Sequence, residues 1–284
     1  MKKCLLVVNM FKSRSQKLAE EIKSFLEEKK VTVFEFDYDG TSSGAAQIQS
    51  FGESADFAIT LGGDGTVLFA CRFCSKRGIP VFPVNLGEFG FLASVSVADW
   101  KKNLEDFLEG KTKEGKRSLV EAEVIRNGKS VFKTTAMNDV VISSTAASRL
   151  INLNVAYNSA LLGPFRANGI IVATATGSTA YSAAAGGPII DPSLDALVLT
   201  PVNSFSLSAR PLVFNSKGEL AITVLNSREK IGLSADGQLN FDLQVLDVVI
   251  LKISEKKASL VCSTQTQFYS ALKSKLNWSG GPSA

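Results

Sequence analysis

Histidine is absent from all 284 residues of the chain. Its absence excludes Ser-His-Asp and Cys-His nucleophilic triads, zinc sites ligated by histidine, and acid–base catalysis by imidazole. Any catalysis by this chain must therefore use carboxylates, hydroxyls, amines, backbone amides or a borrowed metal ion.

Long hydrophobic runs and cysteines are also scarce. No apolar run approaches the ~18–20 residues that span a bilayer. The apolar stretch 4–8 is short, and the polar segment after it has no small-residue cleavage site, so we expect no signal peptide. Four cysteines are too few for a disulfide scaffold. We therefore expect a cytoplasmic protein with no membrane partner.

The excess of positive charge is small. Lys and Arg total 31 against 27 for Asp and Glu, a net charge of +4, which gives no support to nucleic acid as a partner. The one basic concentration, residues 111–117, lacks interleaved aromatic residues that stack on bases, and we interpret it as a solvated connector. Apolar residues make up 45% and charged residues 20%, as in ordinary globular proteins. The length suits two domains or one large one.

The first hundred residues alternate between strand and helix patterns. Apolar runs predict buried strands, and apolar residues spaced three and four apart predict amphipathic helices. The strands are expected at 4–9, 31–36, 57–61 and 79–84, and the helices at 18–26, 67–74 and 100–108. Repeated βα units of this length predict an α/β domain over residues 1–116, with a doubly wound, mostly parallel sheet. A terminal helix within 265–284, marked by Phe268, Leu272 and Leu276, is expected to pack back on it.

After Gly115 the pattern becomes β-rich, and helical periodicity is nearly absent except in a short stretch after Gly177. Asn127-Gly128 between two short strands is a strong hairpin signal. Further strands are expected near 150–157, 170–173, 197–200, 220–225 and 246–253. Residues 117–264 are therefore predicted to form a second domain, a sandwich or layered sheet.

A glycine-rich turn, Gly62-Gly63-Asp64-Gly65-Thr66, joins an expected strand to an expected helix. Glycines let the backbone approach an anion closely, and the positive end of the helix favours phosphate. A carboxylate in such a turn suggests that it binds a cation, accepts a proton or holds a hydroxyl. The alternative is a tight turn with Asp64 as helix N-cap. The spacings of a P-loop and of a dinucleotide-binding fingerprint are both absent.

Hydroxyl residues gather around Gly177 in the segment 174–182, which ends before Gly186-Gly187-Pro188. The segment offers amide and hydroxyl donors at the start of a short helix, or else Ser178 or Thr179 is a structural N-cap. Asn138-Asp139 places an amide beside a carboxylate at a strand start, with a simple turn as the alternative. Cys71 and Cys74 form a CxxC pair that we interpret as buried small side chains.

Taken in order, these motifs resemble the NAD kinase family, also called ATP-NAD kinases. The resemblance covers nearly the whole chain and rests on the motifs at 62–66, 85–92, 138–139, 176–182 and 234–237, and on Leu276-Asn277-Trp278 at the end. The glycine–aspartate turn is shared with diacylglycerol, sphingosine and phosphofructokinases, whereas the segment 176–182 with the Asn-Asp pair is more specific. The resemblance implies an α/β domain, a β domain and NAD bound between them, in homo-oligomers, often tetramers, whose neighbouring subunit helps complete the NAD site.

The resemblance also assigns roles. It implies that Asp64 activates or orients the 2′-hydroxyl of the adenosine ribose, and that Asn138 and Asp139 bind the adenosine half. ATP, or polyphosphate in some members, donates the phosphoryl group with a divalent metal such as magnesium, held mainly by the phosphates rather than by protein side chains. The remaining positions implied to bind the two substrates are Gly62, Gly63, Gly65, Thr66, Arg166, Asn168, Thr176, Thr179, Ala180, Tyr181 and Asp236.

Some positions depart from the usual pattern of the family. Ala167-Asn168 stands where Gly-Asp is common, Ala175 where proline is usual, and Phe205 where histidine is common. These changes leave Asp64 intact and are expected to affect contacts on the nicotinamide side. Two other functions stay open: a lipid or sugar kinase of the same superfamily, and a catalytically silent NAD(P)-binding sensor.

Overall fold

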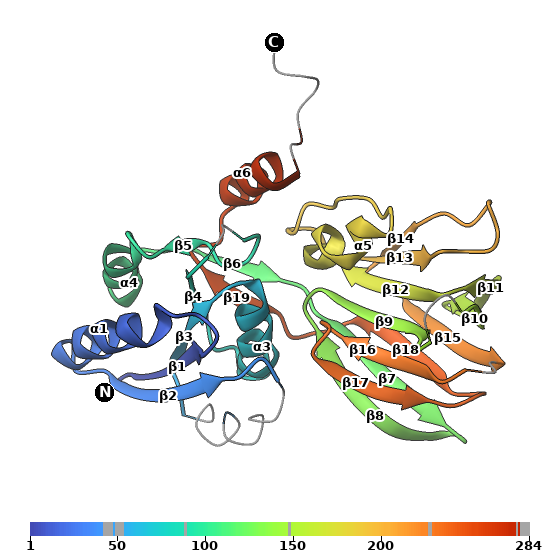
Figure 1. Cartoon of the computed structure of the whole chain (residues 1–284), viewed down its shortest axis with the longest axis horizontal. Coiled ribbons are helices and arrows are strands. Elements are labelled where there is room, and N and C mark those ends of the chain that lie inside the picture. The colour runs from blue at the N-terminus through green and yellow to red at the C-terminus, as the bar shows by residue number, and fades with distance from the viewer. Residues whose placement is uncertain are drawn as a thin grey trace, which may run out of the picture. The chain divides into compact units, whose positions relative to one another are not determined.

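The computed structural model describes residues 1–41, 48, 54–87, 90–146, 149–226, 229–276 and 278. The Gly-, Ser- and Ala-rich stretch at 39–54 lies mostly outside this part of the chain, as do Glu88, Phe89 and Asn277 of the quoted motifs. The chain forms two compact units (Figure 1). Unit 1 comprises residues 1–116 and 257–284, and unit 2 comprises residues 117–256. Within the described residues, every helix is too short or too polar to cross a membrane.

Unit 1 is built on a mainly parallel sheet. Its order is β2-β1-β3-β4-β19-β6, with β5 beside β4. The pairs β1–β2, β1–β3, β3–β4 and β4–β19 are parallel, which confirms the predicted architecture of this domain. Its elements are β1 (Lys3–Asn9), α1 (Ser15–Glu28), β2 (Thr32–Tyr38), β3 (Phe57–Gly62), α3 (Asp64–Cys74), η1 (Ser75–Arg77), β4 (Val81–Asn85), β5 (Val95–Ser96), α4 (Trp100–Leu108), β6 (Glu114–Arg117), β19 (Ala258–Val261) and α6 (Gln265–Leu276).

Helices cover both faces of this sheet, because alternate residues of each strand point to opposite sides. Leu6 and its neighbours two residues away pack with Ile22 of α1 and Leu104 of α4 in one buried cluster. On the other face, Phe69 of α3 stacks on Phe36 of β2 with ring centroids 5.7 Å apart. The apolar runs of β1 and β3 are buried along their length for this reason.

Strand β19, which follows unit 2 in the sequence, belongs to the sheet of unit 1. Leu260 of β19 lies opposite Val81 of β4 in parallel register, and Val261 joins the buried cluster of unit 1. The sequence prediction placed these residues in the second domain, within 117–264. The difference has a simple cause: β19 has only four residues, and its pairing partner lies far away in the sequence.

Unit 2 consists of two antiparallel six-stranded sheets, β11-β10-β15-β18-β7-β8 and β14-β13-β12-β9-β16-β17. Apolar residues of both sheets form one buried core, among them Val124, Leu153, Ile142 and Val172, so the predicted β-rich layered domain is confirmed. The strands are β7 (Val120–Arg126), β8 (Lys129–Ala136), β9 (Asp139–Ser144), β10 (Ile151–Tyr157), β11 (Ala160–Ala167), β12 (Gly169–Thr174), β13 (Ala196–Val202), β14 (Leu212–Asn215), β15 (Glu219–Asn226), β16 (Ile231–Ala235), β17 (Leu239–Leu243) and β18 (Val248–Ile253).

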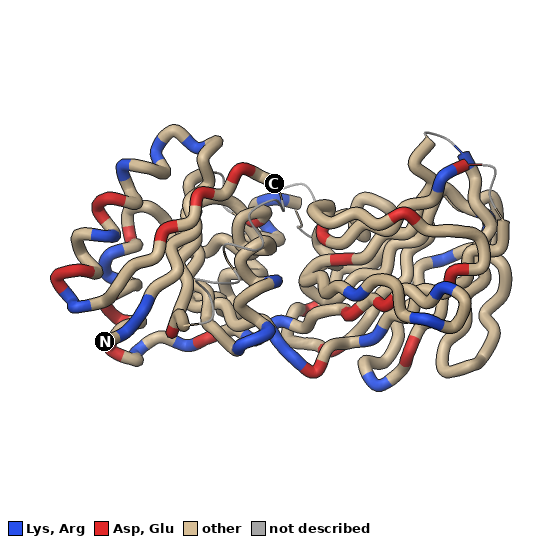
Figure 2. The backbone as a smooth tube through the Cα atoms, turned by 90° about the horizontal axis from the view of Figure 1, so that it is seen from below, with Lys and Arg blue, Asp and Glu red and all other residues tan. Residues whose placement is uncertain are grey.

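Local signals explain parts of unit 2. Asn127 and Gly128 both have positive φ (50° and 74°) and connect β7 to β8, as the hairpin signal predicts. The short helical stretch after Gly177 is a 3₁₀ turn, η2 (Thr176–Thr179), followed by the one-turn helix α5 (Tyr181–Ala184). Along both units basic and acidic positions are interspersed (Figure 2).

Candidate active site

The carboxyl edge of the parallel sheet in unit 1 gathers the predicted glycine-rich turn. Strands β1, β3 and β4 end at Asn9, Gly62 and Asn85, and parallel strands bring these ends to the same edge. Asn9 Nδ2 donates a hydrogen bond to Thr66 Oγ1 at 3.0 Å, so the Thr66 hydroxyl is directed toward β1. A Cβ at residue 62 would lie 2.8 Å from Thr66 Cβ, which explains the glycine there.

Asp64 is the first residue of α3, and its carboxylate accepts three backbone hydrogen bonds. Oδ2 accepts from the Phe91 amide at 2.9 Å, and Oδ1 accepts from the Leu92 and Ala93 amides at 3.1 and 2.9 Å. The N-cap of α3 is Gly63, and no side chain caps the helix. The alternative that Asp64 is an N-cap is therefore wrong: its carboxylate bonds to the segment after β4 instead.

The remaining glycines of the turn leave its backbone open. Gly63 has extended backbone (φ −112°), and a Cβ placed on it would meet nothing within 4 Å. Gly65 is exposed. The N-terminal end of α3 is thus accessible for an anion at the point where the helix dipole is positive.

Lys12 lies at the same edge and was missed by the sequence analysis. Its Nζ lies 3.5 Å from the position that a Cβ of Gly87 would take, beside the loop that follows β4. That loop is held by a hydrogen bond of 2.9 Å from the Gly87 amide to Asn85 Oδ1. An exposed lysine in the loop after β1 carries no motif spacing that could have identified it.

In unit 2, five predicted residues line one cavity of about 400 Å³. They come from three places in the sequence: the start of β9, the link between η2 and α5, and the turn between β16 and β17. These five residues are Asn138, Asp139, Ala180, Tyr181 and Asp236, and the cavity is completed by Val141, Ser143, Ser234 and Gly237.

Asp236 organises this cavity through backbone hydrogen bonds. Its carboxylate accepts from the amides of Met137 at 3.0 Å, Asn138 at 2.8 Å and Asp139 at 3.3 Å, and its own amide donates to the Asp139 carbonyl at 2.9 Å. Its backbone is left-handed (φ 52°). The simple-turn interpretation of Asn138-Asp139 is therefore incomplete, because this pair is fixed by a second carboxylate distant in the sequence.

Asp139 has an unusual environment for a carboxyl group. It is only 5% exposed, at the first position of β9. Burial, and secondly the negative charge of Asp236, raise the pKa of Asp139 to about 7. Asp139 therefore changes its charge near neutral pH, in a chain that has no histidine to do so.

The hydroxyl residues around Gly177 belong to η2, which packs on the backbone of Asn138. A Cβ at residue 177 would lie 2.6 Å from Asn138 Cα, so only glycine allows η2 to pack on the Asn138 backbone. Ser178 Oγ accepts from the Ile190 amide at 2.9 Å, and Thr179 Oγ1 donates to the Thr176 carbonyl at 3.1 Å, so neither is an N-cap. The Thr176 side-chain hydroxyl is buried and has no hydrogen-bond partner.

Arg166 and Asn168 lie elsewhere in unit 2. They precede β12, whereas η2 follows it, and the six residues of this strand extend over roughly 17–20 Å. The Arg166 guanidinium lies over the Phe205 ring, 4.9 Å from its centroid, and Asn168 Nδ2 donates to the Arg149 carbonyl at 2.8 Å. Neither Arg166 nor Asn168 is among the residues that line the Asn138 cavity.

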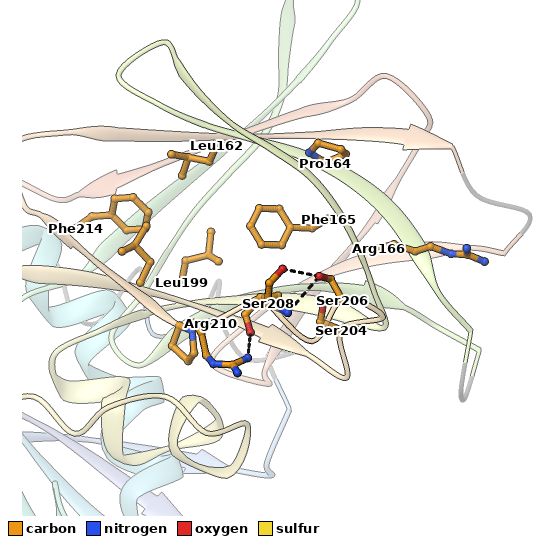
Figure 3. Close-up of a pocket in the computed structure, with 13 residues that line it drawn as sticks. Leu162, Pro164, Phe165, Arg166, Leu199, Ser204, Ser206, Ser208, Arg210 and Phe214 are labelled. Carbon is orange, nitrogen blue, oxygen red and sulfur yellow. Dashed lines mark hydrogen bonds between the residues drawn. The ribbon is translucent and has the colours of Figure 1, made fainter.

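Arg166 borders a second cavity of about 430 Å³ (Figure 3). Phe165, Leu199 and Phe214 form its apolar wall, and the loop between β13 and β14 supplies serines and Arg210. In Figure 3 the Arg166 side chain points away from this apolar wall. Apolar and serine-rich, this second cavity differs in chemistry from the acidic cavity at Asn138.

Comparison with known proteins assigns the family. The ATP-NAD kinase N-terminal domain model matches residues 44–112, and the ATP-NAD kinase C-terminal domain model matches residues 137–263. The NAD kinase of Treponema denticola is 46% identical over 100% of this chain and 99% of its own length. That of Treponema pallidum is 43% identical over 98% of this chain and 90% of its own length. This chain belongs to the NAD kinase family.

Two solved structures of NAD kinases share the fold. Yeast NADH kinase complexed with NADH has a TM-score of 0.87 and 24% identity, over 99% of this chain and 89% of that one. The NAD kinase from Archaeoglobus fulgidus in complex with ATP has a TM-score of 0.78 and 22% identity, over 98% and 99% of the two chains. At these identities the likeness establishes the fold alone.

The positions that depart from the NAD kinase pattern have local explanations. Ala175 has φ −57° and ψ −37°, a backbone that proline also adopts, so the turn keeps its conformation without proline. Asn168 uses its amide to donate to a carbonyl, which an aspartate cannot do when ionised. Phe205 is 68% exposed and meets the Arg166 guanidinium with its ring. These three residues and Ala167 all belong to unit 2, whereas Asp64 belongs to unit 1.

Proposed function

We propose that this protein transfers the terminal phosphoryl group of ATP to the 2′-hydroxyl of the adenosine ribose of NAD, giving NADP. The observation that carries this proposal is the fixed Asp64 carboxylate beside an open helix N-terminus, in a chain of the NAD kinase family. Phosphoryl transfer has a loose transition state, so positioning and electrostatics matter more than the strength of a base. Asp64 is the residue that orients the hydroxyl and accepts its proton.

The ATP phosphates are proposed to bind at the carboxyl edge of the sheet in unit 1. The positive end of α3 attracts phosphate, and Gly63 offers no side chain to obstruct it. Lys12 adds an exposed ammonium group at this edge. Main-chain amides and one lysine thereby supply the donor site without any histidine.

Magnesium is proposed to enter as part of the magnesium–ATP substrate. The described residues contain no cluster of three or more Cys, Asp and Glu side chains that could hold a metal ion. The Asp64 carboxylate already accepts three amide hydrogen bonds. The residues present therefore do not fit a protein-built magnesium cage, and phosphate oxygens are the ligands that remain.

The adenosine half of NAD is proposed to bind in the cavity of unit 2. Its volume of about 400 Å³ suits a nucleoside, and Asn138 and Asp139 present amide and carboxyl groups to it. When ionised, Asp139 can accept a hydrogen bond from the exocyclic amine of adenine. The half-exposed Tyr181 ring offers a flat apolar surface for a base, and Thr176 and Thr179 shape the turn behind it.

Arg166 and Asn168 are proposed to act on NAD bound to another copy of the chain, within a dimer or tetramer. Support for this comes from the lining of the Asn138 cavity, which includes neither of the two residues. Exposed apolar side chains near them suit a homo-oligomeric interface: Leu161, Leu162, Phe205, Leu207, Leu212 and Val213. Light scattering after gel filtration measures the oligomeric state directly.

We also propose a cytoplasmic location, where a reducing environment suits the four cysteines. All four are free and buried, and burial raises the pKa of the Cys74 thiol to about 12. Cys71 and Cys74 of the CxxC pair lie among the buried side chains of α3.

The test is formation of NADP by the purified protein with magnesium–ATP and NAD, read with a dehydrogenase specific for NADP. We expect catalytic turnover. Phosphorylation of a lipid or sugar acceptor without NADP formation would show that the protein is instead a lipid or sugar kinase of the same superfamily. NAD binding in calorimetry without any turnover would indicate a silent sensor. Polyphosphate and NADH in parallel reactions define the donor and acceptor preference.

A further inference from the structure

The segment 90–93 surrounds the Asp64 carboxylate with main-chain donors. The amides of Phe91, Leu92 and Ala93 all donate to it, at 2.9, 3.1 and 2.9 Å. Oδ1 receives two of these hydrogen bonds and Oδ2 receives one. Hydrogen bonds to an ionised carboxylate are among the stronger ones in proteins, so together they fix both the position and the rotation of the group.

Gly90 makes this arrangement possible. A Cβ at residue 90 would lie 2.6 Å from Asp64 Cγ and 2.8 Å from Oδ2, and closer still to Oδ1. The backbone of Gly90 is outside the left-handed region, so its φ does not require glycine. Space for the carboxylate is the reason for glycine at this position. Because the carboxylate is itself tied by three hydrogen bonds, it cannot move aside without losing some of them.

The number of lone pairs limits what Asp64 can still do. An ionised carboxylate offers about four acceptor sites, two on each oxygen. Amides of the described residues fill three of these sites, which leaves one on Oδ2. One site suits one donor, such as a hydroxyl group. Chelation of a cation by both oxygens would displace at least one amide.

We infer that residues 90–93 form an amide cradle that leaves Asp64 one acceptor site, on Oδ2, for the substrate hydroxyl, and that Gly90 is a positioning residue acting through Asp64. The inference rests on the proposed function of Asp64 in phosphoryl transfer. It adds that catalysis depends on a glycine that supplies no atom to the reaction.

Helix α6 supports the cradle from outside. The Phe268 ring packs against the Phe91 ring with centroids 5.9 Å apart, and Lys275 Nζ lies 5.9 Å from the Phe91 ring centroid. Phe268 is buried. The residue whose amide binds Oδ2 is thereby held by its side chain as well.

A double-mutant cycle of Gly90→Ala and Asp64→Ala tests the inference. Gly90→Ala should lower kcat by about 100-fold, the effect expected of a misplacement of about 1 Å, while the KM values for ATP and NAD change less than about threefold. Asp64→Ala should lower kcat by ~10²- to 10⁴-fold. The kcat of the double variant should equal that of Asp64→Ala, because with alanine at position 64 there is no carboxylate for the new methyl group to overlap with.

The outcomes separate this inference from the proposed function. If kcat of the double variant is about 100-fold lower than kcat of Asp64→Ala, Gly90 acts independently of Asp64 and the inference is wrong. Wild-type kcat in Gly90→Ala overturns it as well. Wild-type turnover in Asp64→Ala contradicts the proposed role of Asp64 instead. Gly232→Ala, where the new Cβ makes only ordinary contacts from 3.5 Å, controls for adding a methyl group to a glycine.

A second measurement does not depend on activity. Hydrogen exchange of the peptide covering residues 90–95 should be slow in the wild type and markedly faster in Asp64→Ala, because its amides lose their acceptor. Peptides from β3 and β4 in the same experiment report whether unit 1 remains folded. Unchanged exchange at 91–93 in a folded Asp64→Ala variant would show that the cradle does not exist in solution.

Discussion

Asp64 in unit 1 and Asp236 in unit 2 each accept hydrogen bonds from three consecutive backbone amides, those of residues 91–93 and 137–139. A glycine also packs against each group: Gly90 against the Asp64 carboxylate, and Gly177 against the backbone of Asn138. The surroundings differ. Asp64 starts a helix at an open sheet edge, whereas Asp236 lies beside Asp139, whose pKa is raised first by burial and secondly by the charge of Asp236.

The comparison shows that one backbone device can have two chemical results. Around Asp64, three amides hold the carboxylate that we propose to receive the substrate hydroxyl. Around Asp236, three amides hold a charge that adds to the effect of burial in raising the pKa of the neighbouring Asp139 to about 7. Both carboxylates are bound in the same way, so the difference in their chemical effect comes from the groups that surround them.

The largest effect is expected from Asp64→Asn. The amide side chain has one acceptor oxygen, and its NH₂ group would face at least one of the donors from 91–93, so the variant loses both the proton acceptor and part of the cradle. We expect kcat to fall by ~10²- to 10⁴-fold with NAD affinity close to the wild type. Steady-state kinetics and calorimetry with NAD check this. Wild-type turnover together with wild-type NAD affinity would remove Asp64 from the reaction.

Gly177→Ala tests whether the glycine of unit 2 serves substrate binding rather than chemistry. The new Cβ would press on the main chain of Asn138, which is itself held by Asp236. We expect the KM for NAD to rise by roughly tenfold or more, with a loss of about 1–3 kcal/mol in the free energy of unfolding. In contrast to Gly90→Ala, kcat at saturating NAD should change little. Urea denaturation and initial rates separate the two effects, and a selective loss of kcat would contradict this division of roles.

Asp139→Asn tests the raised pKa. The folded-state pKa of Asp139 is about 7 against an ordinary value of 3.8, so the folded state binds more protons between these values. The stability contribution of Asp139 is therefore fully present below about pH 4 and is lost as pH rises toward 7, by at most about 1.4 kcal/mol per pH unit. The variant, which cannot ionise, should show a flatter stability profile over this window. Parallel profiles of variant and wild type would show that Asp139 does not titrate there.

The smallest effect is expected from Asn168→Asp, which restores the residue common in the family. The change removes the hydrogen bond to the Arg149 carbonyl, but residue 168 lies at the other end of β12 from Asn138. We expect a change of about threefold to tenfold in the KM for NAD and an unchanged kcat. A large fall in kcat at saturating NAD would mean that Asn168 is coupled to the phosphoryl path.

Much of the fold follows from local patterns in the sequence. The buried runs of β1 and β3, the helical face of α1 and the Asn127-Gly128 hairpin were predictable because neighbouring residues determine them. Strand β19 was assigned to the other domain, because four residues carry no information about a partner almost 180 positions away.

The site was less predictable than the fold. Its side chains can be recognised in motifs, and the structure does bring Asn138, Asp139 and Asp236 together. The donors that hold Asp64 are main-chain amides, which leave no signature in the residue types at 91–93. Arg166 is close in sequence to the 176–182 motif, but strand β12 lies between them and separates them in space.

The contribution of the chain's last residues to unit 1 also sets an order of assembly. Strand β19 and helix α6 complete the sheet and the support of Phe91, yet they are made after all of unit 2. Unit 2 is continuous in sequence and has its own core. During synthesis it can therefore fold before β19 is available to pair with the strands formed by residues 1–116. Asp64 therefore reaches its final support only after residues 258–276 have been synthesised. A nascent chain halted before residue 257 should contain a folded β domain and an α/β domain that is still vulnerable to proteases.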